Sequence, residues 1–163
     1  MPAGSDAARR TMRPLSLDDL EAVIAIDRAH TGHARRPFFA KRMAAAARHP
    51  DDFIQVGVMW GGALCGFAIA RILRGEFGRE EAVAVLDAVG VEPQSQECGV
   101  GSSLMHELAG SLRAMGVHIL HSQADWKDQD LLRFLHASGF AMAPRLALER
   151  AVGEPLGEAA EEG

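Results

Sequence analysis

The first part of the chain alternates apolar and polar residues in a way that predicts one strand followed by two helices. The strand is expected at about residues 11–15. The helix after it has Ser16 at a position suited to an N-cap and an apolar side at helical spacing. That side consists of Leu20, Val23, Ile24 and Ile26. A second helix is expected over about 37–49, because Pro37 suits the first turn of a helix.

The middle of the chain has the pattern of three strands. Gly61 and Gly62 separate the apolar runs 54–60 and 63–72, and a type I′ turn requires positive φ at both of its central residues. These two runs are therefore expected to pair as an antiparallel hairpin. The run 83–91 is nearly continuous in apolar character, which is typical of a strand covered on both faces.

The last third of the chain continues with helix, strand, helix and strand. Apolar residues recur at helical spacing over 104–115, and Gly116 follows them as a stop signal. A strand over 117–124, a helix over 128–137 and a last strand around 140–150 are expected after it. The whole pattern predicts an α/β (α+β) fold with a mixed sheet flanked by helices.

Composition is that of an ordinary globular domain. The 163 residues suit one core, with 48% apolar and 24% charged residues. The formal net charge of −5 gives no support to nucleic-acid binding, which usually needs a basic face, and a small amine-bearing substrate is more compatible with it. We expect one domain over 11–152, between a flexible tail at 1–10 and a flexible acidic tail at 153–163.

Cysteine usage and hydropathy bear on the compartment. Cys65 and Cys98 are too few and too differently placed to form a disulfide framework, so reduced thiols are expected. No apolar run approaches the ~18 residues of a membrane span, and the N-terminus lacks the apolar core of a signal peptide. The protein is expected to be cytoplasmic, with no membrane partner.

The strongest functional signal is the segment 96–102, which lies between an apolar strand and an amphipathic helix. The first N–H groups of a helix lack partners within it and point outward at its positive end. Gly99 and Gly101 would let a phosphate approach the main chain, and Ser102 adds a hydroxyl donor. A diphosphate would fit there; the alternative is an ordinary strand-to-helix connection that contains glycine.

Two other phosphate-binding loops are absent from the sequence. The pattern GxxxxGK[ST] does not occur, since Lys41 and Lys127 are the only lysines and neither follows such a loop. The pattern GxGxxG does not occur either, because no third glycine follows Gly99 and Gly101 at the required spacing. Both absences weigh against a nucleoside triphosphate or NAD.

The same segment resembles motif A of the GNAT superfamily of N-acetyltransferases. The pyrophosphate signature of that motif is Gln/Arg-x-x-Gly-x-Gly/Ala, and Gln96, Gly99 and Gly101 fill it. The preceding residues 89–91 are similar to the strand end that these enzymes use to hold the pantetheine arm of acetyl-CoA. Weaker matches on both sides extend the resemblance to roughly 11–150.

The resemblance implies both a fold and a donor site. The fold would be a GNAT-like mixed, mostly antiparallel central sheet of about six or seven strands flanked by about four helices. Acetyl-CoA would be the acyl donor, and no metal is expected. The donor-binding positions that it implies are Val89, Gly90, Val91, Gln96, Glu97, Cys98, Gly99, Val100, Gly101, Ser102 and Asp128.

Asp87 is the candidate general base. The attacking amine must be neutral, so a group that takes its proton is expected. Asp87 interrupts the apolar strand just before the expected position of the thioester, on the nominal side of Val85, Val89 and Val91. Some relatives carry a glutamate at the position of Val85, so the match is not direct, and a purely structural hydrogen bond is the alternative role for Asp87.

Other candidate positions each have two interpretations. Asp128 stands where relatives often have an asparagine that contacts CoA, and it also suits the N-cap of the helix that follows. Many relatives use a tyrosine to return a proton to the CoA thiolate, but the matching residue is Leu135 and the chain has no tyrosine. Water or His136 could take that role. His30 and His33 offer too few ligands for a metal ion.

The function that the resemblance implies is transfer of the acetyl group of acetyl-CoA to a primary amine, by direct attack in a ternary complex. The acceptor is a small amine or a peptide or protein amino group. Similar proteins commonly dimerise, so a homodimer is an option. Two alternatives stay open: a CoA-binding GNAT-like module with a regulatory or interaction role and little turnover, and an interaction domain whose loop binds no nucleotide.

Overall fold

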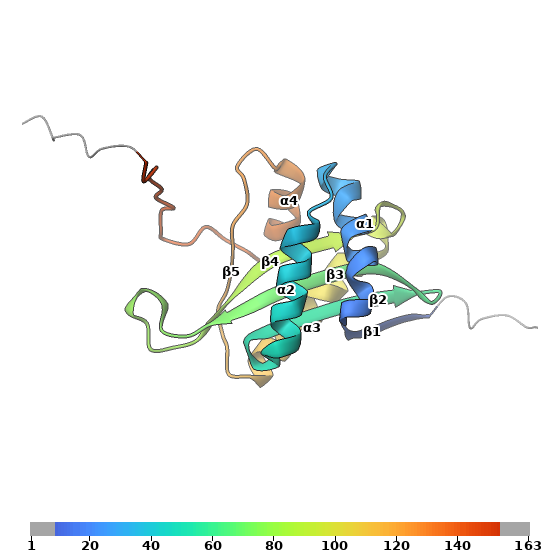
Figure 1. Ribbon diagram of the computed structural model, residues 1–163, viewed down its shortest axis with the longest axis horizontal. Helices are drawn as coiled ribbons and strands as arrows, with labels where there is room; N and C mark the ends of the chain where they lie inside the picture. The colour runs from blue at the N-terminus through green and yellow to red at the C-terminus, as the bar shows by residue number, and fades with distance from the viewer. Residues whose placement is uncertain (1–8, 154–163) are drawn as a thin grey trace, which may run out of the picture.

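The computed structural model describes residues 9–153 and contains a five-stranded sheet in the order β1-β2-β3-β4-β5 (Figure 1). Neighbouring strands pair antiparallel from β1 to β4, whereas β4 and β5 pair parallel. The predicted mixed, mostly antiparallel sheet is confirmed. The strands are β1 (Arg10–Pro14), β2 (Phe53–Trp60), β3 (Ala63–Leu73), β4 (Val83–Val91) and β5 (Leu120–Ser122).

Four α-helices cover the two faces of this sheet, as predicted. They are α1 (Leu20–Thr31), α2 (Arg36–Arg48), α3 (Val100–Ala114) and α4 (Gln129–Ala137). Short 3-10 helices are formed by Leu17–Asp19, Pro50–Asp52, Glu76–Gly78 and Pro93–Cys98. Figure 1 shows α1 and α2 across the front of the sheet and α3 behind it. One buried cluster, around Phe39 and Phe67, lies under α1 and α2, and the other, around Leu104 and Leu108, lies under α3.

The hairpin between β2 and β3 forms as its glycines predict. Gly61 and Gly62 have φ values of 59° and 81°, and Trp60 stands opposite Ala63 across the turn. Both glycines adopt a backbone conformation that side chains disfavour. The register of β2 against β3 next to the turn is therefore set locally.

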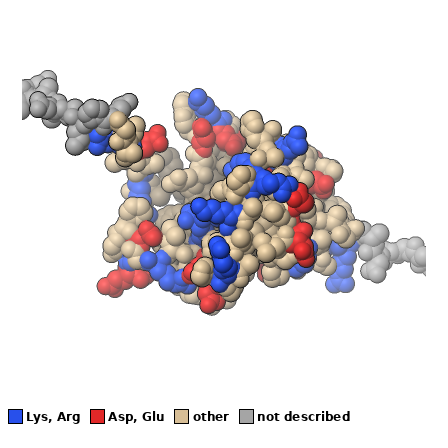
Figure 2. Space-filling model, in the orientation of Figure 1, with Lys and Arg blue, Asp and Glu red and all other residues tan. Residues whose placement is uncertain are grey.

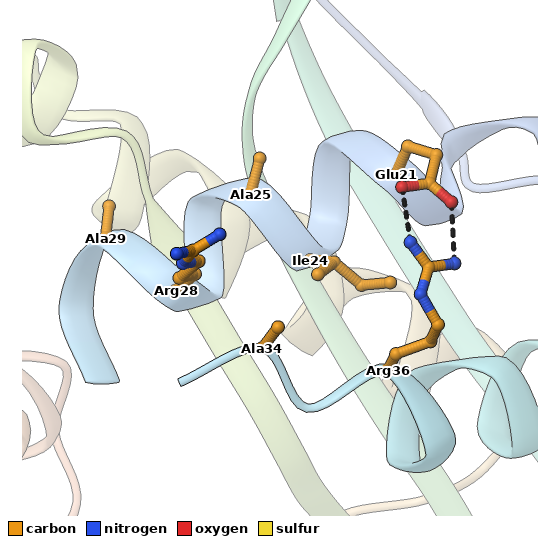
Figure 3. Close-up of a pocket in the computed structure, with 7 residues that line it drawn as sticks. All are labelled: Glu21, Ile24, Ala25, Arg28, Ala29, Ala34 and Arg36. Atoms are coloured by element: carbon orange, nitrogen blue, oxygen red, sulfur yellow. Dashed lines mark hydrogen bonds and ion pairs between the residues drawn. The ribbon is translucent and has the colours of Figure 1, made fainter. Parts of the chain in front are cut away.

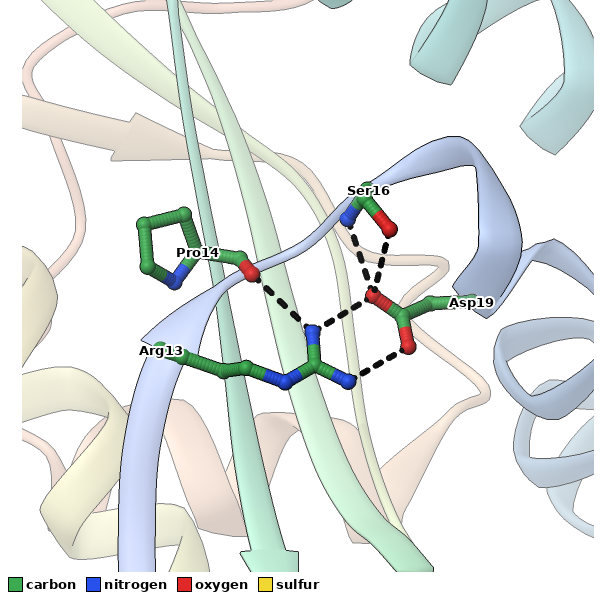
Figure 4. A network of polar contacts seen from close by, with 4 residues as sticks. All are labelled: Arg13, Pro14, Ser16 and Asp19. Carbon is green, nitrogen blue, oxygen red and sulfur yellow. Dashed lines mark hydrogen bonds and ion pairs between the residues drawn. The ribbon is translucent and has the colours of Figure 1, made fainter.

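A polar network fixes the start of α1 against β1 (Figure 4). Two nitrogens of Arg13 donate to the two oxygens of Asp19 at 2.7 and 2.8 Å, and the Ser16 N–H donates to Asp19 at 2.8 Å. Asp19 is buried, and the hydrogen bonds from Arg13 lower the pKa of its carboxyl group against the opposing effect of burial. The expected helix start near Ser16 is confirmed, with a single 3-10 turn before α1.

The C-terminal part departs from the sequence-based expectation. Only Leu120–Ser122 of the strand expected over 117–124 pairs with β4. Residues 140–150 form no strand in the described part of the chain, and Met142 and Leu148 are 99% and 89% exposed. A strand requires a partner for its main-chain groups, and no strand among residues 9–153 pairs with this segment. The predicted count of six or seven strands is therefore too high.

The expected tails are largely untested by the structure. β1 begins at Arg10, one residue before the strand expected at about 11–15, and the domain bounds of 11–152 stay a prediction. Residues 1–8 and 154–163 lie outside the described residues. Within the described residues, no helix has both the length and the apolar character needed to cross a membrane.

Candidate active site

Over half its length, one main-chain edge of β4 lacks a strand partner among the described residues. β5 pairs with β4 only from Ala84 to Leu86. From Asp87 to Val91, the edge of β4 that faces away from β3 has no strand beside it in the described chain. Such an edge presents N–H and C=O groups that an extended molecule can bind. The residues expected to hold the pantetheine arm, Val89, Gly90 and Val91, all lie on this stretch.

The free edge leads directly to the N-terminus of α3. After β4 the chain forms the 3-10 helix Pro93–Cys98 and enters α3 at Gly99, whose φ is 75°. The first hydrogen bond of α3 runs from the Ser103 N–H to the Gly99 carbonyl at 3.1 Å. The N–H groups of residues 100–102 thus have no acceptor within the helix, which suits an anion. The structure places the predicted loop beside the predicted strand end.

Two glycines let α3 begin close to its neighbours. A Cβ atom on Gly101 would lie 2.7 Å from a ring carbon of Phe134 on α4. A Cβ atom on Gly66 of β3 would lie 2.7 Å from a methyl group of Val100, the first residue of α3. Both distances are too short for real side chains. Gly101 therefore has a packing role besides the phosphate approach that the sequence suggests.

Within the loop, Gln96 and Glu97 are exposed and Cys98 is half-buried. The amide nitrogen of Gln96 lies 3.3 and 3.4 Å from the two ring nitrogens of His30. His30 Nε2 also lies 2.5 Å from the carbonyl oxygen of Val91. His30 thus joins the end of α1 to the end of β4 and to the loop.

Sequence reasoning considered His30 only as a metal ligand and missed this link, because nothing in the sequence relates His30 to Val91. Among the residues that the structure describes, no group of three His, Cys, Asp or Glu side chains could hold a metal ion.

Asp87 is the extra residue of a β-bulge. In the pairing of β3 with β4, Ile69 stands opposite Ala88 and Ala70 opposite Leu86, so Asp87 has no partner. Its side chain contacts α2, and Ala88 belongs to the cluster under α1 and α2. Two successive side chains therefore lie on one face.

The bulge corrects one sequence-based expectation. Val89 and Val91 pack in the cluster under α3, on the opposite face from Asp87. Strict alternation put all three on one side, and it fails because the bulge shifts the alternation by one residue.

The carboxylate of Asp87 is held by two arginines. Its Oδ2 accepts a hydrogen bond from Arg71 Nε on β3 at 2.7 Å, and Arg42 Nε on α2 lies 3.3 Å from the same oxygen. The side chain is 7% exposed. Its Oδ1 has no hydrogen-bond partner in the described part of the chain. One oxygen is thus fixed and the other is available to accept a proton.

The structure bears on the predictions for Asp128 and Leu135 in different ways. Asp128 Oδ1 accepts a hydrogen bond from the Leu131 N–H at 3.1 Å, so the N-cap role is confirmed. Its role in CoA binding stays a prediction. Leu135 is buried in the cluster under α3, so the position of the relatives' tyrosine is apolar here. His136 is exposed.

Two hollows lie on the α1 and α2 side of the molecule. One, of about 390 Å³, is lined by charged groups that include Arg42 and Arg71, so it adjoins Asp87. The other, of about 520 Å³, lies between α1 and the segment leading to α2, beside the paired Glu21 and Arg36 (Figure 3). Helical spacing puts this second hollow on the face of α1 opposite His30. The first hollow is therefore the one next to the candidate site.

A mixed sheet with an open strand edge that ends at the N-terminus of a helix is the arrangement expected of an acyl-CoA-dependent acyltransferase. The model of the Acetyltransferase (GNAT) family matches residues 18–140, which is well over half of the chain. The protein belongs to this family of N-acetyltransferases, for which acetyl-CoA is the typical donor.

Solved structures share the fold at low sequence identity. Aminoglycoside N-acetyltransferase AAC(6')-Iy in complex with CoA is 18% identical, with a TM-score of 0.71, covering 93% of this chain and 99% of that chain. AAC(6')-Ih from Acinetobacter baumannii is 14% identical, with a TM-score of 0.73, covering 91% and 100%. Glucosamine-6-phosphate N-acetyltransferase from Arabidopsis thaliana is 13% identical, with a TM-score of 0.67, covering 88% and 99%. A comparison with curated protein sequences found no match.

Proposed function

We propose that this protein transfers the acetyl group of acetyl-CoA to a primary amine by direct attack within a ternary complex. The observation that carries the proposal is the junction of the free β4 edge with the N-terminus of α3. A molecule with an extended polar arm and a diphosphate needs both features, in this order. Membership of the GNAT family supports the same donor.

The donor would be held mainly by main-chain groups. The diphosphate would accept hydrogen bonds from the N–H groups of residues 100–102, and the pantetheine arm would pair with residues 89–91. Acetyl-CoA supplies an activated thioester carbonyl. A free N–H of β4 near Asp87 would polarise that carbonyl and stabilise the negative charge that develops on it.

The acceptor amine must lose a proton in order to attack. Asp87 Oδ1 would take that proton, because the hydrogen bond from Arg71 engages the other oxygen. Leu135 offers no proton for the departing thiolate, whose modest basicity lets it leave unassisted or with a proton from water. Alignment of the amine with the thioester then supplies much of the rate enhancement.

Calorimetry with acetyl-CoA tests the donor site. We expect saturable binding by the wild-type protein and about tenfold weaker binding by Gly99→Ala, because a side chain at φ 75° strains the loop. Gly116→Ala is the matched control, since Gly116 has φ 77° at the opposite end of α3. Absence of saturable binding to the wild-type protein would refute the proposal and favour an interaction domain.

Release of CoA from acetyl-CoA across a panel of amines tests the transfer. We expect turnover with at least one acceptor, and a large fall in Asp87→Asn. Normal turnover in Asp87→Asn would remove Asp87 as the base and leave the transferase function intact.

A second candidate function is a CoA-binding module with little turnover. The observations that favour it are the apolar Leu135 and the engagement of Asp87 by two arginines. Binding of acetyl-CoA without CoA release for any amine would select this alternative.

A further inference from the structure

The carboxylate of Asp87 meets more positive charge than it can balance. Arg71 and Arg42 come from different elements, β3 and α2. Arg71 Nε donates to Oδ2 of Asp87, and Arg42 Nε lies 3.3 Å from the same oxygen. The cluster therefore contains two guanidinium groups and one carboxylate. Its local excess charge is positive.

Most of the hydrogen-bond donors of these arginines are unused. A guanidinium group has five N–H donors in a planar fork, and of these two groups only Arg71 Nε donates a hydrogen bond to Asp87. The Nη groups of Arg42 and Arg71 make no hydrogen bond with the residues that the structure describes. The two side chains are 29% and 30% exposed, so these donors are half-buried but open to a ligand. Such a fork suits the paired oxygens of a carboxylate or phosphate.

The hollow beside these donors has room for a small molecule. Its volume is about 390 Å³. Arg74 also lines it but is paired with Asp52, and Glu76 at its rim is exposed, so solvent screens its charge. Among the charged residues that line the hollow, Arg42 and Arg71 are the two that contact Asp87. Figure 2 shows Lys and Arg side chains gathered over the face that α1 and α2 cover.

We infer that the acceptor of this enzyme carries a carboxylate or phosphate group besides its amine, and that Arg42 and Arg71 bind this group while the amine lies at Asp87. The inference rests on the proposed function, because it assigns the acceptor of that same site. Amino acids and phosphorylated amino sugars have this chemistry. A polycationic acceptor would bring ammonium groups against two guanidinium groups, and like charges disfavour that complex.

Matched pairs of acceptors test the inference by CoA release. One pair is an amino acid and its carboxamide, and the other is glucosamine 6-phosphate and glucosamine. We expect kcat/KM at least about tenfold higher for the charged member of one pair, the scale of one charge-assisted hydrogen bond. The pair that shows the preference identifies the anionic group as carboxylate or phosphate.

Variants locate the source of the preference. Arg71→Gln and Arg42→Gln should each reduce it toward unity. Arg48→Gln is the matched control, because Arg48 is an exposed residue of α2 outside the hollow, and it should keep the preference. Circular dichroism and thermal melting establish that each variant folds. If neither arginine variant folds, the inference is judged from the two acceptor pairs assayed with the wild-type protein.

Equal kcat/KM within both pairs overturns the inference, and so does a preference that survives in both Arg42→Gln and Arg71→Gln. Failure of the proposed function is distinguishable, since then no amine releases CoA. In that case calorimetric titration of the charged and neutral acceptors into the protein still tests the anion site. If the charged acceptor binds more tightly than the neutral one, and Arg71→Gln abolishes this difference, the proposed anion site is supported. Equal binding of the two acceptors would refute the anion site.

Discussion

The two faces of the sheet are built from different chemistry. Under α3 the buried cluster is apolar, and glycines let the helix approach the strands closely. Under α1 and α2 an equally apolar cluster is bordered by three aspartates, and each is paired with arginine. These aspartates are Asp19, Asp27 and Asp87.

In the proposed function, this difference would separate two tasks. The main-chain N–H groups at the start of α3 would bind a diphosphate without regard to side chains. The charged side chains on the α1 and α2 face would distinguish one acceptor from another. Changes in side-chain volume under α3 should therefore affect donor binding. Changes in charge on the α1 and α2 face should affect the preference among acceptors.

The largest expected effect comes from adding a methyl group beneath α3. Gly66→Ala places a Cβ atom against Val100 and should lower the free energy of unfolding by about 1–3 kcal/mol. It should also weaken acetyl-CoA binding, because Val100 is the first residue of α3. Urea unfolding and calorimetry measure the two effects.

Gly57→Ala is the matched control on the other face. Its Cβ atom would lie 2.8 Å from methyl groups of Leu15 and Leu64, so it should also destabilise the protein. Acetyl-CoA affinity should stay unchanged. Equal loss of affinity in the two variants would contradict the separation of the faces.

The next largest effect is expected from a buried carboxylate on α1. Asp27 is 5% exposed and accepts hydrogen bonds from two nitrogens of Arg35, whose pKa is raised chiefly by those bonds. Asp27→Asn should cost about 1 kcal/mol in urea unfolding, a value reduced because Arg35 is 42% exposed. Asp130→Asn, in a pair 94% exposed at the aspartate, should change stability by less than about 0.5 kcal/mol. Similar losses in both would show that burial of Asp27 has no role.

A smaller effect depends on pH. Arg13 lowers the pKa of Asp19 in the folded protein, so ionised Asp19 stabilises the fold above its unfolded pKa of about 3.9. That contribution is lost as the pH falls below about 4, through the lower folded pKa. Wild-type protein should exceed Asp19→Asn in stability near neutral pH, and the gap should narrow in acid. A gap that is constant with pH would mean that the charge of Asp19 contributes nothing.

The smallest change uses the two thiols as reporters. Burial raises the pKa of the Cys65 thiol, whereas Cys98 is half-buried directly before Gly99. Iodoacetamide should therefore modify Cys98 first, and acetyl-CoA should slow that reaction. Mass spectrometry of wild type and Cys65→Ser measures the rates. If saturating acetyl-CoA does not change the rate at which iodoacetamide modifies Cys98, the donor binds elsewhere.

Local sequence signals predicted most of the fold. The hairpin at Gly61-Gly62, the helix start near Ser16 and the N-cap at Asp128 depend on residues adjacent in sequence, and all three are confirmed. The loop ending at Gly99 lies between strand and helix as its pattern indicated. In each case the same few residues both carry the signal and adopt the structure.

Features that depend on distant partners were not predictable. The residues 140–150 have a strand-like pattern, but pairing requires a neighbour that no local pattern reveals. Arg42 and Arg71 meet at Asp87 only through the packing of α2 on β3. The bulge itself left no mark in the run 83–91, which is apolar on both sides of Asp87.

The bulge also limits how this strand can be aligned with those of its relatives. One inserted residue separates two stretches of β4, and side chains alternate regularly between the two faces within each stretch. Residues of β4 can therefore be matched one by one with those of a strand without a bulge only up to Asp87. An alignment without a gap there would assign residues 88–91 to the wrong side of the sheet. Counted back from the loop at residues 96–102, the correspondence between Val85 and another enzyme's glutamate crosses this extra residue, so superposition in space is needed to establish it.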